Sequence, residues 1–265
     1  MAKLLNISTR ERVEQDNDVL IGGFIVIGNE PKKIVVRALG PSLSVNGVPV
    51  PDRLEDPVLE LHASDGSLIT TNDNWMELDQ SAINDLEANH LAPSDSRESA
   101  IVAMLAPGAY TGIVRGKDDT EGIALAEAYD VTARSHSQVG NISTRGFVQI
   151  EDNVMIGGFE LGQNPGDAHI VVRALGPSLA DYGIPDTLAD PTLELRDSEG
   201  NLLSMNDNWP EDPAQAALIT SKGLAPKNML ESAAAIDLPA GGYTVIVRGN
   251  NAGTGVGLVE VYNTP

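Results

Sequence analysis

Charged side chains that could carry chemistry occur in matched pairs along this chain. Three arginines and three glutamates of the first half return at equivalent places in the second half, and several stand inside apolar runs. A charge in such a run is costly unless it is paired. These side chains either converge on a ligand or form Arg–Glu pairs that fix strand register, and we favour structural ion pairs. The set comprises Arg10, Arg37, Glu60, Glu98, Arg115, Glu127, Arg145, Arg173, Glu194, Glu231, Arg248 and Glu260.

Arg37 and Arg173 have a further shared feature. Each comes directly before an identical Ala-Leu-Gly-Pro-Ser-Leu segment. Gly and Pro together are typical of a turn. We therefore expect these two arginines to brace that turn.

A tract of oxygen-bearing side chains, Asn-Asp-Asn-Trp, also occurs twice. Clustered carboxylate and amide oxygens are what Ca²⁺ prefers, although the tract lacks the spacing and the terminal glutamate of an EF-hand. The same residue types also cap turns through their own side chains, and we favour capping. The alternative is a calcium site, for which the candidate ligands are Asp56, Asn72, Asp73, Asn74, Asp190, Asn206, Asp207 and Asn208.

Trp75 and Trp209 end the two tracts and are the only tryptophans. An exposed indole stacks on sugar rings, whereas a buried one anchors a core. Because the same position beside a turn is filled in both copies, we expect core anchors, with glycan stacking as the alternative.

Catalytic patterns are missing from the sequence. The chain has no cysteine, which excludes a thiol nucleophile, a cysteine-ligated metal and a disulfide. None of the histidines recurs at an equivalent position, and Gly-Pro-Ser-Leu lacks the second glycine of a nucleophile elbow. We therefore expect no enzymatic activity and no cofactor, apart from the calcium alternative.

The charge balance restricts the partners. Seventeen basic residues face 38 acidic ones, which gives a formal net charge of −21. Binding of nucleic acid requires a basic face, so nucleic acid is not an expected partner. No apolar run approaches the ~18 residues of a membrane span, so membrane insertion is not expected either.

The elements that position these residues form two copies of one module. Asn-Ile-Ser-Thr-Arg at 6–10 returns at 141–145, and residues 34–43 return unchanged as residues 170–179. Matching blocks continue to the end of each copy. Repeats of this kind are the first organisational signal in a sequence. They predict a first domain over 1–131, a linker over 132–139 and a second domain over 140–265.

Each copy is rich in short Ile- and Val-containing runs separated by turn residues. Residues 58–61 and 68–71 flank a Ser-Asp-Gly-Ser turn and predict a hairpin, while 80–90 and 214–222 are the only helical stretches. We expect an all-β chain made of two tandem β-sandwich domains. Each would be jelly-roll-like, with about eight strands and one short helix.

The succession Asn-Ile-Ser-Thr-Arg, Leu-Ile-Gly-Gly-Phe, Arg-Ala-Leu-Gly-Pro-Ser-Leu, Asn-Asp-Asn-Trp resembles a repeat module that is strung in tandem in large exported bacterial proteins. From residues 59–61 to 114–116 and in the matching part of the second copy, the chain also resembles the bacterial pre-peptidase C-terminal domain. These resemblances imply export and an accessory or structural role. They imply no catalytic residues.

Together these features predict a non-enzymatic structural or adhesive module of a secreted or cell-surface bacterial protein, as a segment of a longer exported chain. The expected partner is itself or neighbouring repeats, paired through open edge strands, with residues 4–9 as the candidate edge. The alternative is a carbohydrate-binding accessory module of an exported enzyme, with glycans as partners. An aromatic content of 4% counts against it.

Overall fold

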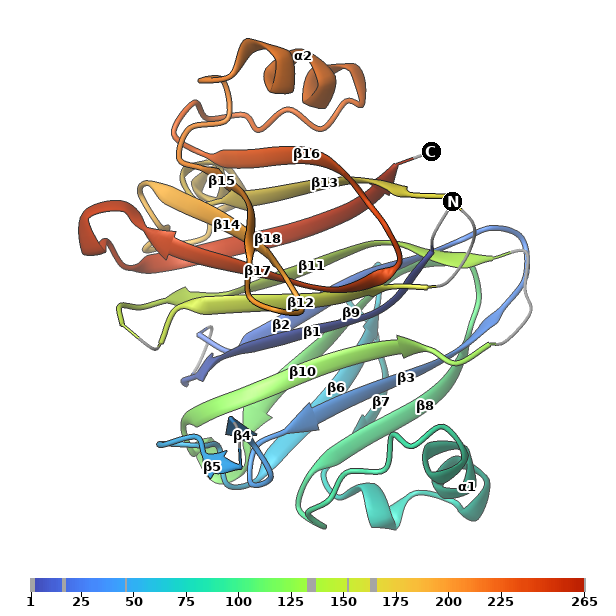
Figure 1. Ribbon diagram of the computed structural model, residues 1–265. Helices are drawn as coiled ribbons and strands as arrows, with labels where there is room; N and C mark the ends of the chain where they lie inside the picture. The colour runs from blue at the N-terminus through green and yellow to red at the C-terminus, as the bar shows by residue number, and fades with distance from the viewer. Residues whose placement is uncertain are drawn as a thin grey trace. The chain divides into compact units, whose positions relative to one another are not determined.

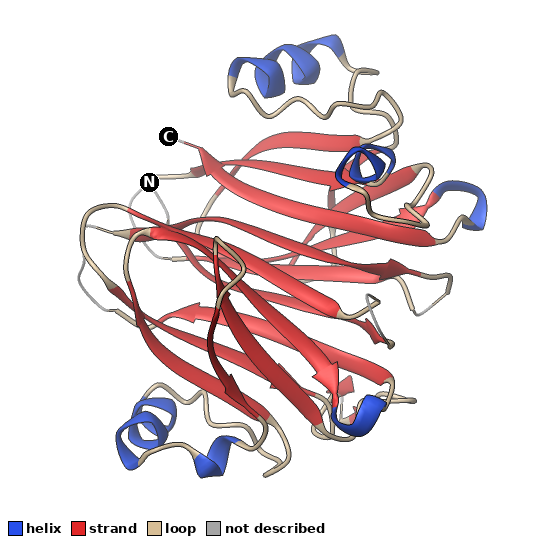
Figure 2. Cartoon of the chain, turned by 180° about the vertical axis from the view of Figure 1, so that it is seen from behind, coloured by secondary structure: helices blue, strands red, loops and turns tan. Residues whose placement is uncertain are grey.

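The computed structural model describes residues 3–15, 18–45, 47–132, 137–151, 153–162 and 166–264, and most of these lie in β-strands (Figures 1 and 2). The expectation of an all-β chain is therefore confirmed. The chain divides into two compact units. The N-terminal unit is Asn6–Val139, and the C-terminal unit consists of the described residues of Gly140–Pro265 and of Met1–Leu5.

Two sets of antiparallel strands build the N-terminal unit. One set has the order β1-β10-β3-β8 and the other the order β2-β9-β6-β7. Their bounds are β1 Leu4–Val13, β2 Leu20–Ile27, β3 Lys32–Leu39, β6 Pro57–Ala63, β7 Leu68–Asn72, β8 Ser99–Leu105, β9 Gly108–Gly116 and β10 Gly122–Asp130. The smaller elements are β4 Ser44–Val45, β5 Val48–Pro49, α1 Gln80–Ala88 and the 3₁₀ turns η1 Trp75–Glu77 and η2 Lys117–Asp119.

The C-terminal unit repeats this pairing scheme. Its strand orders are β11-β18-β13-β16 and β12-β17-β14-β15. The bounds are β11 Gln138–Val148, β12 Met155–Leu161, β13 Ala168–Leu175, β14 Pro191–Asp197, β15 Leu202–Asn206, β16 Ser232–Leu238, β17 Gly241–Gly249 and β18 Gly255–Thr264. Its helical elements are η3 Pro177–Tyr182, α2 Pro213–Ser221 and η4 Asn250–Ala252.

Alternation of apolar and polar residues decides which strand faces are buried. In β14, Leu193 and Leu195 are fully buried, while Glu194 and Arg196 on the other face are partly exposed. Strand β3 is different because Ile34, Val35 and Val36 are all buried. One of its faces lies against the core between the strand sets, and the other lies under α1, where Val35 packs with Leu86 and Trp75.

Short helices cover the outer face of one strand set in each unit (Figure 2). Helix α1 begins where the Asp79 carboxylate accepts a hydrogen bond from the N–H of Ala82 at 2.9 Å, and Asp212 caps α2 in the same way. Such caps stabilise a helix start by about 1 kcal/mol. Both helices coincide closely with the two stretches predicted from the sequence.

The first strand is longer than the edge segment expected at residues 4–9. Strand β1 continues to Val13, and its residues Asn6–Val13 pair with β10. The carbonyl of Lys3 accepts a hydrogen bond from the N–H of Gly162 at 2.7 Å within the C-terminal unit. Strands β7 and β15, which each pair along one side only, also have exposed apolar side chains.

Candidate functional site

Arg37 stands at the centre of a polar cluster on the helix-covered face of the N-terminal unit. Its Nε donates to Glu127 Oε2 at 2.9 Å, and its Nη1 donates to the carbonyl of Leu91 at 2.6 Å. The guanidinium carbon lies 5.2 Å from the centre of the Tyr129 ring, whose hydroxyl donates to Glu127 at 2.7 Å. Strands β3 and β10 position the pair, because their register sets Arg37 opposite Glu127.

The C-terminal unit contains the same cluster built from Arg173, Glu260, Tyr262 and the carbonyl of Leu224. Arg173 Nε to Glu260 Oε2 is again 2.9 Å. Burial and the adjacent glutamate raise the pKa of both tyrosines, Tyr129 and Tyr262, to about 12. Every donor has an acceptor inside the unit, so the cluster joins strands to the segment that follows the helix.

The braces of the Gly-Pro-Ser turns are glutamates, not the arginines expected from the sequence. Glu98 is fully buried, and its Oε1 accepts from Gly40 N and Ser42 N, both at 3.0 Å, and from Ser42 Oγ. Glu231 does the same for Gly176 and Ser178. The arginines before these turns point to Glu127 and Glu260 instead, because alternation places them on the helix-covered face.

The remaining predicted ion-pair residues fall into two groups. Arg115 Nε lies 3.8 Å from Glu60 Oε1, and Arg248 Nη1 lies 3.0 Å from Glu194 Oε1, so these pairs join neighbouring strands. Arg10 and Arg145 are found in no ion pair within the described parts of the chain. Burial lowers the pKa of Arg145.

The first asparagine of each Asn-Asp-Asn-Trp tract bridges two segments of its unit. The amide of Asn72 donates to the carbonyl of Asn74 at 3.0 Å and accepts from the N–H of Ala100 at 2.9 Å. Asn206 makes the same contacts with Asn208 and Ala233. These amide oxygens are engaged by backbone N–H groups, which favours the turn-capping interpretation for Asn72 and Asn206.

The tryptophans are anchored by their ring nitrogens. Trp75 is 6% exposed, and its Nε1 donates to the carbonyl of Asp95 at 3.1 Å. Trp209, which is partly buried, donates to the carbonyl of Asn228 at 3.1 Å and packs against the cluster that contains Val171 and Ile219. The buried ring of Trp75 offers no platform for a sugar.

The aspartates of the tract meet a second aspartate from the loop before β6. Asp56 and Asp73 flank Lys117, whose Nζ lies 3.7 Å from Asp56 Oδ2 and 2.6 Å from Asp73 Oδ2. Burial raises the pKa of Asp56, an effect opposed by the lysine charge, and the hydrogen bond to Asp73 raises the pKa of Lys117. An ammonium group therefore lies against both carboxylates and offsets part of their negative charge.

The C-terminal unit has the same aspartates without the ammonium group. Asp190 and Asp207 flank Asn250, whose Nδ2 donates to Asp190 Oδ2 at 3.0 Å and lies 3.4 Å from Asp207 Oδ2. Burial raises the pKa of Asp207, and the charge of Asp190 acts in the same direction. The Oδ1 atoms of Asp190, Asp207 and Asn208 are buried and have no hydrogen-bond partner within the described residues, and the same holds for Asp56 and Asp73 in the N-terminal unit.

These oxygens fit a hard cation in type, because carboxylate and amide oxygens are ligands of Ca²⁺. They are few: within the described residues, no group of three or more His, Cys, Asp or Glu side chains is arranged to hold a metal ion. A cation at Asp190 and Asp207 would need further oxygens from backbone or solvent.

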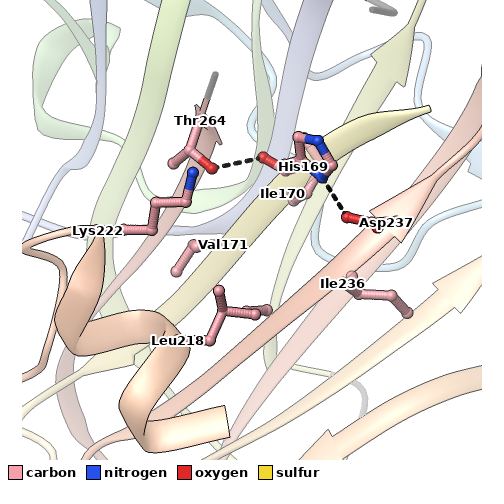
Figure 3. A pocket seen from close by; sticks show the side chains of 9 residues that line it. His169, Ile170, Val171, Leu218, Lys222, Ile236, Asp237 and Thr264 are labelled. Carbon is pink, nitrogen blue, oxygen red and sulfur yellow. Dashed lines mark hydrogen bonds and ion pairs between the residues drawn. The ribbon is translucent and has the colours of Figure 1, made fainter. Parts of the chain in front are cut away.

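A pocket of ≈ 330 Å³ lies beside α2 in the C-terminal unit (Figure 3). Val171 and Leu218 contribute apolar lining, while His169 contacts Asp237 and Thr264 donates to the carbonyl of His169 at 3.0 Å. The His169 and Asp237 side chains are 47% and 63% exposed, so solvent screens their interaction.

At the equivalent place in the N-terminal unit, the Lys33 ammonium on β3 lies 2.7 Å from the Asp85 carboxylate on α1. The helix and the strand are thus linked by an ion pair there, whereas the C-terminal pocket is lined by Leu218. This difference was not predicted from the sequence, because it depends on which helix side chain faces β3 or β13.

Comparisons with known proteins leave the family open. No protein-family model matches the chain, and no curated protein matches it. Among solved structures, a chain from the atomic structure of Sulfolobus turreted icosahedral virus is 10% identical, with a TM-score of 0.22, over 98% of this chain and 90% of that chain. A TM-score this low carries no argument about fold or function. No helix in the described parts of the chain has the length and apolar character to cross a membrane.

Proposed function

We propose that this chain is a non-enzymatic structural or adhesive module of a secreted or cell-surface bacterial protein, folded as two tandem jelly-roll-like β-sandwich domains. The observation that carries the proposal is the use of the repeated charges. Glu98, Arg37 and Glu127, with their counterparts, bind turns, strands and the segment after each helix within one unit. Side chains engaged in this way serve the scaffold.

The edge strands support association with further copies. Within the described residues, β7 pairs with β6 alone, and β15 pairs with β14 alone. Leu68 and Ile69 on β7 are 55% and 44% exposed, and Leu202 and Met205 on β15 are 50% and 68% exposed. Neither strand contains a charged residue or a proline, the usual protections of an edge. Such edges favour pairing with another strand.

Locating the protein and measuring its association together test the proposal. Cells of the native organism are fractionated, and the surface fraction is imaged for fibres with an antibody against the chain. In parallel, sedimentation of the purified chain is compared with that of a Met205→Lys variant, in which an edge charge opposes pairing. The proposal expects surface location and association that the variant weakens. A cytosolic monomer would overturn it. Binding of glycans by a chain that remains monomeric would favour the accessory-module alternative.

We also propose that Ca²⁺ stabilises the C-terminal unit at Asp190 and Asp207. The supporting observation is the exchange of Lys117 for Asn250 between two otherwise matched aspartate pairs. In the N-terminal unit the ammonium group supplies the positive charge, so Asp56 and Asp73 are not expected to take up an ion. In the C-terminal unit the equivalent residue, Asn250, is uncharged, so a bound cation would supply the positive charge.

Thermal unfolding in excess Ca²⁺ and in EDTA tests this second proposal. An ion bound only by native protein raises the melting temperature. Asn250→Lys is expected to abolish the Ca²⁺ response, because the new ammonium group takes the place of the ion. The matched exchange Lys117→Asn is expected to create a second response in the N-terminal unit. An identical melt of the unaltered protein in Ca²⁺ and EDTA would end the idea.

A further inference from the structure

One buried acid takes no part in the clusters described above. Glu11, on β1, is 3% exposed, and neither of its carboxylate oxygens has a hydrogen-bond partner within the described residues. Alternation along β1 places it on the buried face with Ile7, Thr9 and Val13. A carboxyl group without partners in an apolar interior strongly disfavours its charged form.

Several strand positions of the N-terminal unit, including the one opposite Glu11, hold small residues. Strand register places Glu11 opposite Ala124 and Thr9 opposite Ala126 on β10. In the second strand set of the unit, Gly22 pairs with Gly112, and a Cβ added at Gly22 would meet no atom within 4 Å. Alanines and glycines thus occupy these strand positions of the N-terminal unit.

The C-terminal unit fills the equivalent region differently. Gly146 takes the position of Glu11 and pairs with Gly257. Val259 stands opposite Thr144 where the N-terminal unit has Ala126 opposite Thr9, and Val245 pairs with Gly157. A Cβ at Gly157 would lie 3.5 Å from Val259. The C-terminal unit thus has valines in place of Ala126 and Gly112, and a glycine in place of the carboxylic acid.

Within the described N-terminal unit, no strand packed against β1 directs an unpaired charge at Glu11. Strands β2 and β8 contain no charged residue, and Arg115, the charged residue of β9, pairs with Glu60. On β10 and β3, the opposite charges pair as Glu127 with Arg37 and Asp130 with Lys32, and Lys33 pairs with Asp85. Alternation places the neighbours Arg10 and Arg12 on the other face of β1, where Arg12 lies near Glu14 and Glu121.

We propose that Glu11 is an uncharged carboxylic acid at neutral pH and that its ionisation at higher pH loosens the N-terminal unit but not the C-terminal unit. Burial raises the pKa of Glu11 well above its ordinary value, and the charge of Glu14 acts in the same direction. The proposal is independent of the proposed structural role. It assigns a pH response to one of two otherwise matched units.

The sign of the response follows from proton binding. In the unfolded chain Glu11 ionises near the ordinary glutamate value of about 4.3, whereas in the folded unit it keeps its proton to a higher pH. Between these two values the unfolded state binds fewer protons, so stability falls as pH rises. Each pH unit lowers the folding equilibrium constant about tenfold. The loss is absent below the unfolded value and stops growing above the folded one.

The two tryptophans allow each unit to be followed separately. Trp209→Phe leaves Trp75 to report on the N-terminal unit, and Trp75→Phe leaves Trp209 to report on the C-terminal unit. Urea unfolding of each is measured by fluorescence from pH 5 to pH 9, with and without Glu11→Gln. With Glu11, we expect the folding equilibrium constant of the N-terminal unit to fall about tenfold per pH unit, and with Glu11→Gln we expect this fall to be absent. The pH dependence of the C-terminal unit is expected to be the same with either residue. Parallel pH profiles with Glu and Gln, or an equal change in both units, would overturn the proposal.

A direct titration decides the matter even if the Gln variant folds poorly. Carbon NMR of the glutamate carboxyl groups of the full chain is recorded against pH. One carboxyl group is expected to titrate well above the others, and its signal to be missing from the Glu11→Gln spectrum. Titration of every glutamate in the ordinary range would overturn the proposal.

Discussion

Glu98 gives a first test at the scale of single residues. Glu98→Gln keeps the shape of the side chain but turns one acceptor oxygen into a donor, which faces the N–H groups of Gly40 and Ser42 or, with the amide reversed, the N–H of Asp95. Hydrogen bonds to a buried charge contribute about 1.5–3 kcal/mol. We expect the free energy of unfolding of the N-terminal unit to fall by about 2–3 kcal/mol. Urea denaturation of the Trp209→Phe background measures it, and the exposed substitution Glu87→Gln serves as the control.

The buried tyrosines predict a response to alkaline pH. Burial raises the pKa of Tyr129 and Tyr262 to about 12, whereas an unfolded tyrosine ionises near 10. Stability contributed by these neutral phenols is complete below about pH 10 and is lost as pH rises toward 12. Ultraviolet absorbance of the phenolate should show that Tyr129 and Tyr262 titrate later in the native protein than in urea. Titration of every tyrosine near 10 in the native protein would contradict this.

Residue roles were only partly predictable. The pairing of Arg37 with Glu127 agrees with the favoured interpretation of the repeated charges, since a charge inside a strand needs a partner. The role of Glu98 depends on the fold, because its acceptors reach Gly40 and Ser42 more than 50 residues away. The same applies to Asn72, whose partner Ala100 lies on another strand.

At the scale of elements, the β6–β7 and β14–β15 hairpins depend on glycines in the left-handed region. Gly66 and Gly200 have φ values of 83° and 84°, and a Cβ on either would meet no atom within 4 Å. Gly200→Ala therefore introduces backbone strain without a clash, and we expect it to destabilise the C-terminal unit by about 1 kcal/mol.

Gly22→Ala is the matched control, because Gly22 also has free space but no positive φ. We expect it to stabilise the N-terminal unit by about 0.4–1 kcal/mol, through loss of freedom in the unfolded chain. Urea unfolding of both variants measures the difference. Equal effects of the two alanines would contradict the assignment of strain to the hairpin.

Strands and helices were easier to predict than their limits. Apolar runs on either side of a turn indicated the β6–β7 hairpin, and the two helical stretches were also identified from the sequence. The end of β1 was missed because Arg10, Glu11 and Arg12 interrupt the pattern, and a buried, unpaired glutamate is the least expected residue there. The short hairpin β4–β5 has no counterpart in the C-terminal unit, so repetition gave no signal for it.

At the scale of the whole molecule, the net charge of −21 opposes the compact state by self-repulsion. Sodium chloride screens repulsion between exposed charges, with a Debye length of about 10 Å at 0.1 M. We expect the melting temperature to rise as salt is increased from low concentration in EDTA. The same series with sucrose, an uncharged osmolyte, is the control. It shows how much stabilisation comes from exclusion of a solute from the protein surface and how much from screening of charges. A melting temperature that falls with salt would contradict a dominant role for repulsion.

The borders of the folded units are offset from those of the duplicated sequence. The described residues up to Leu5 group with the C-terminal unit, while Ser137 hydrogen-bonds with Glu30 and accepts from Lys32 in the N-terminal unit. Recombination at the border between the two sequence copies would therefore separate each unit from a few residues that pack or hydrogen-bond within it. Gene shuffling should preserve these modules more readily when the crossover falls a few codons away from the duplicated motif.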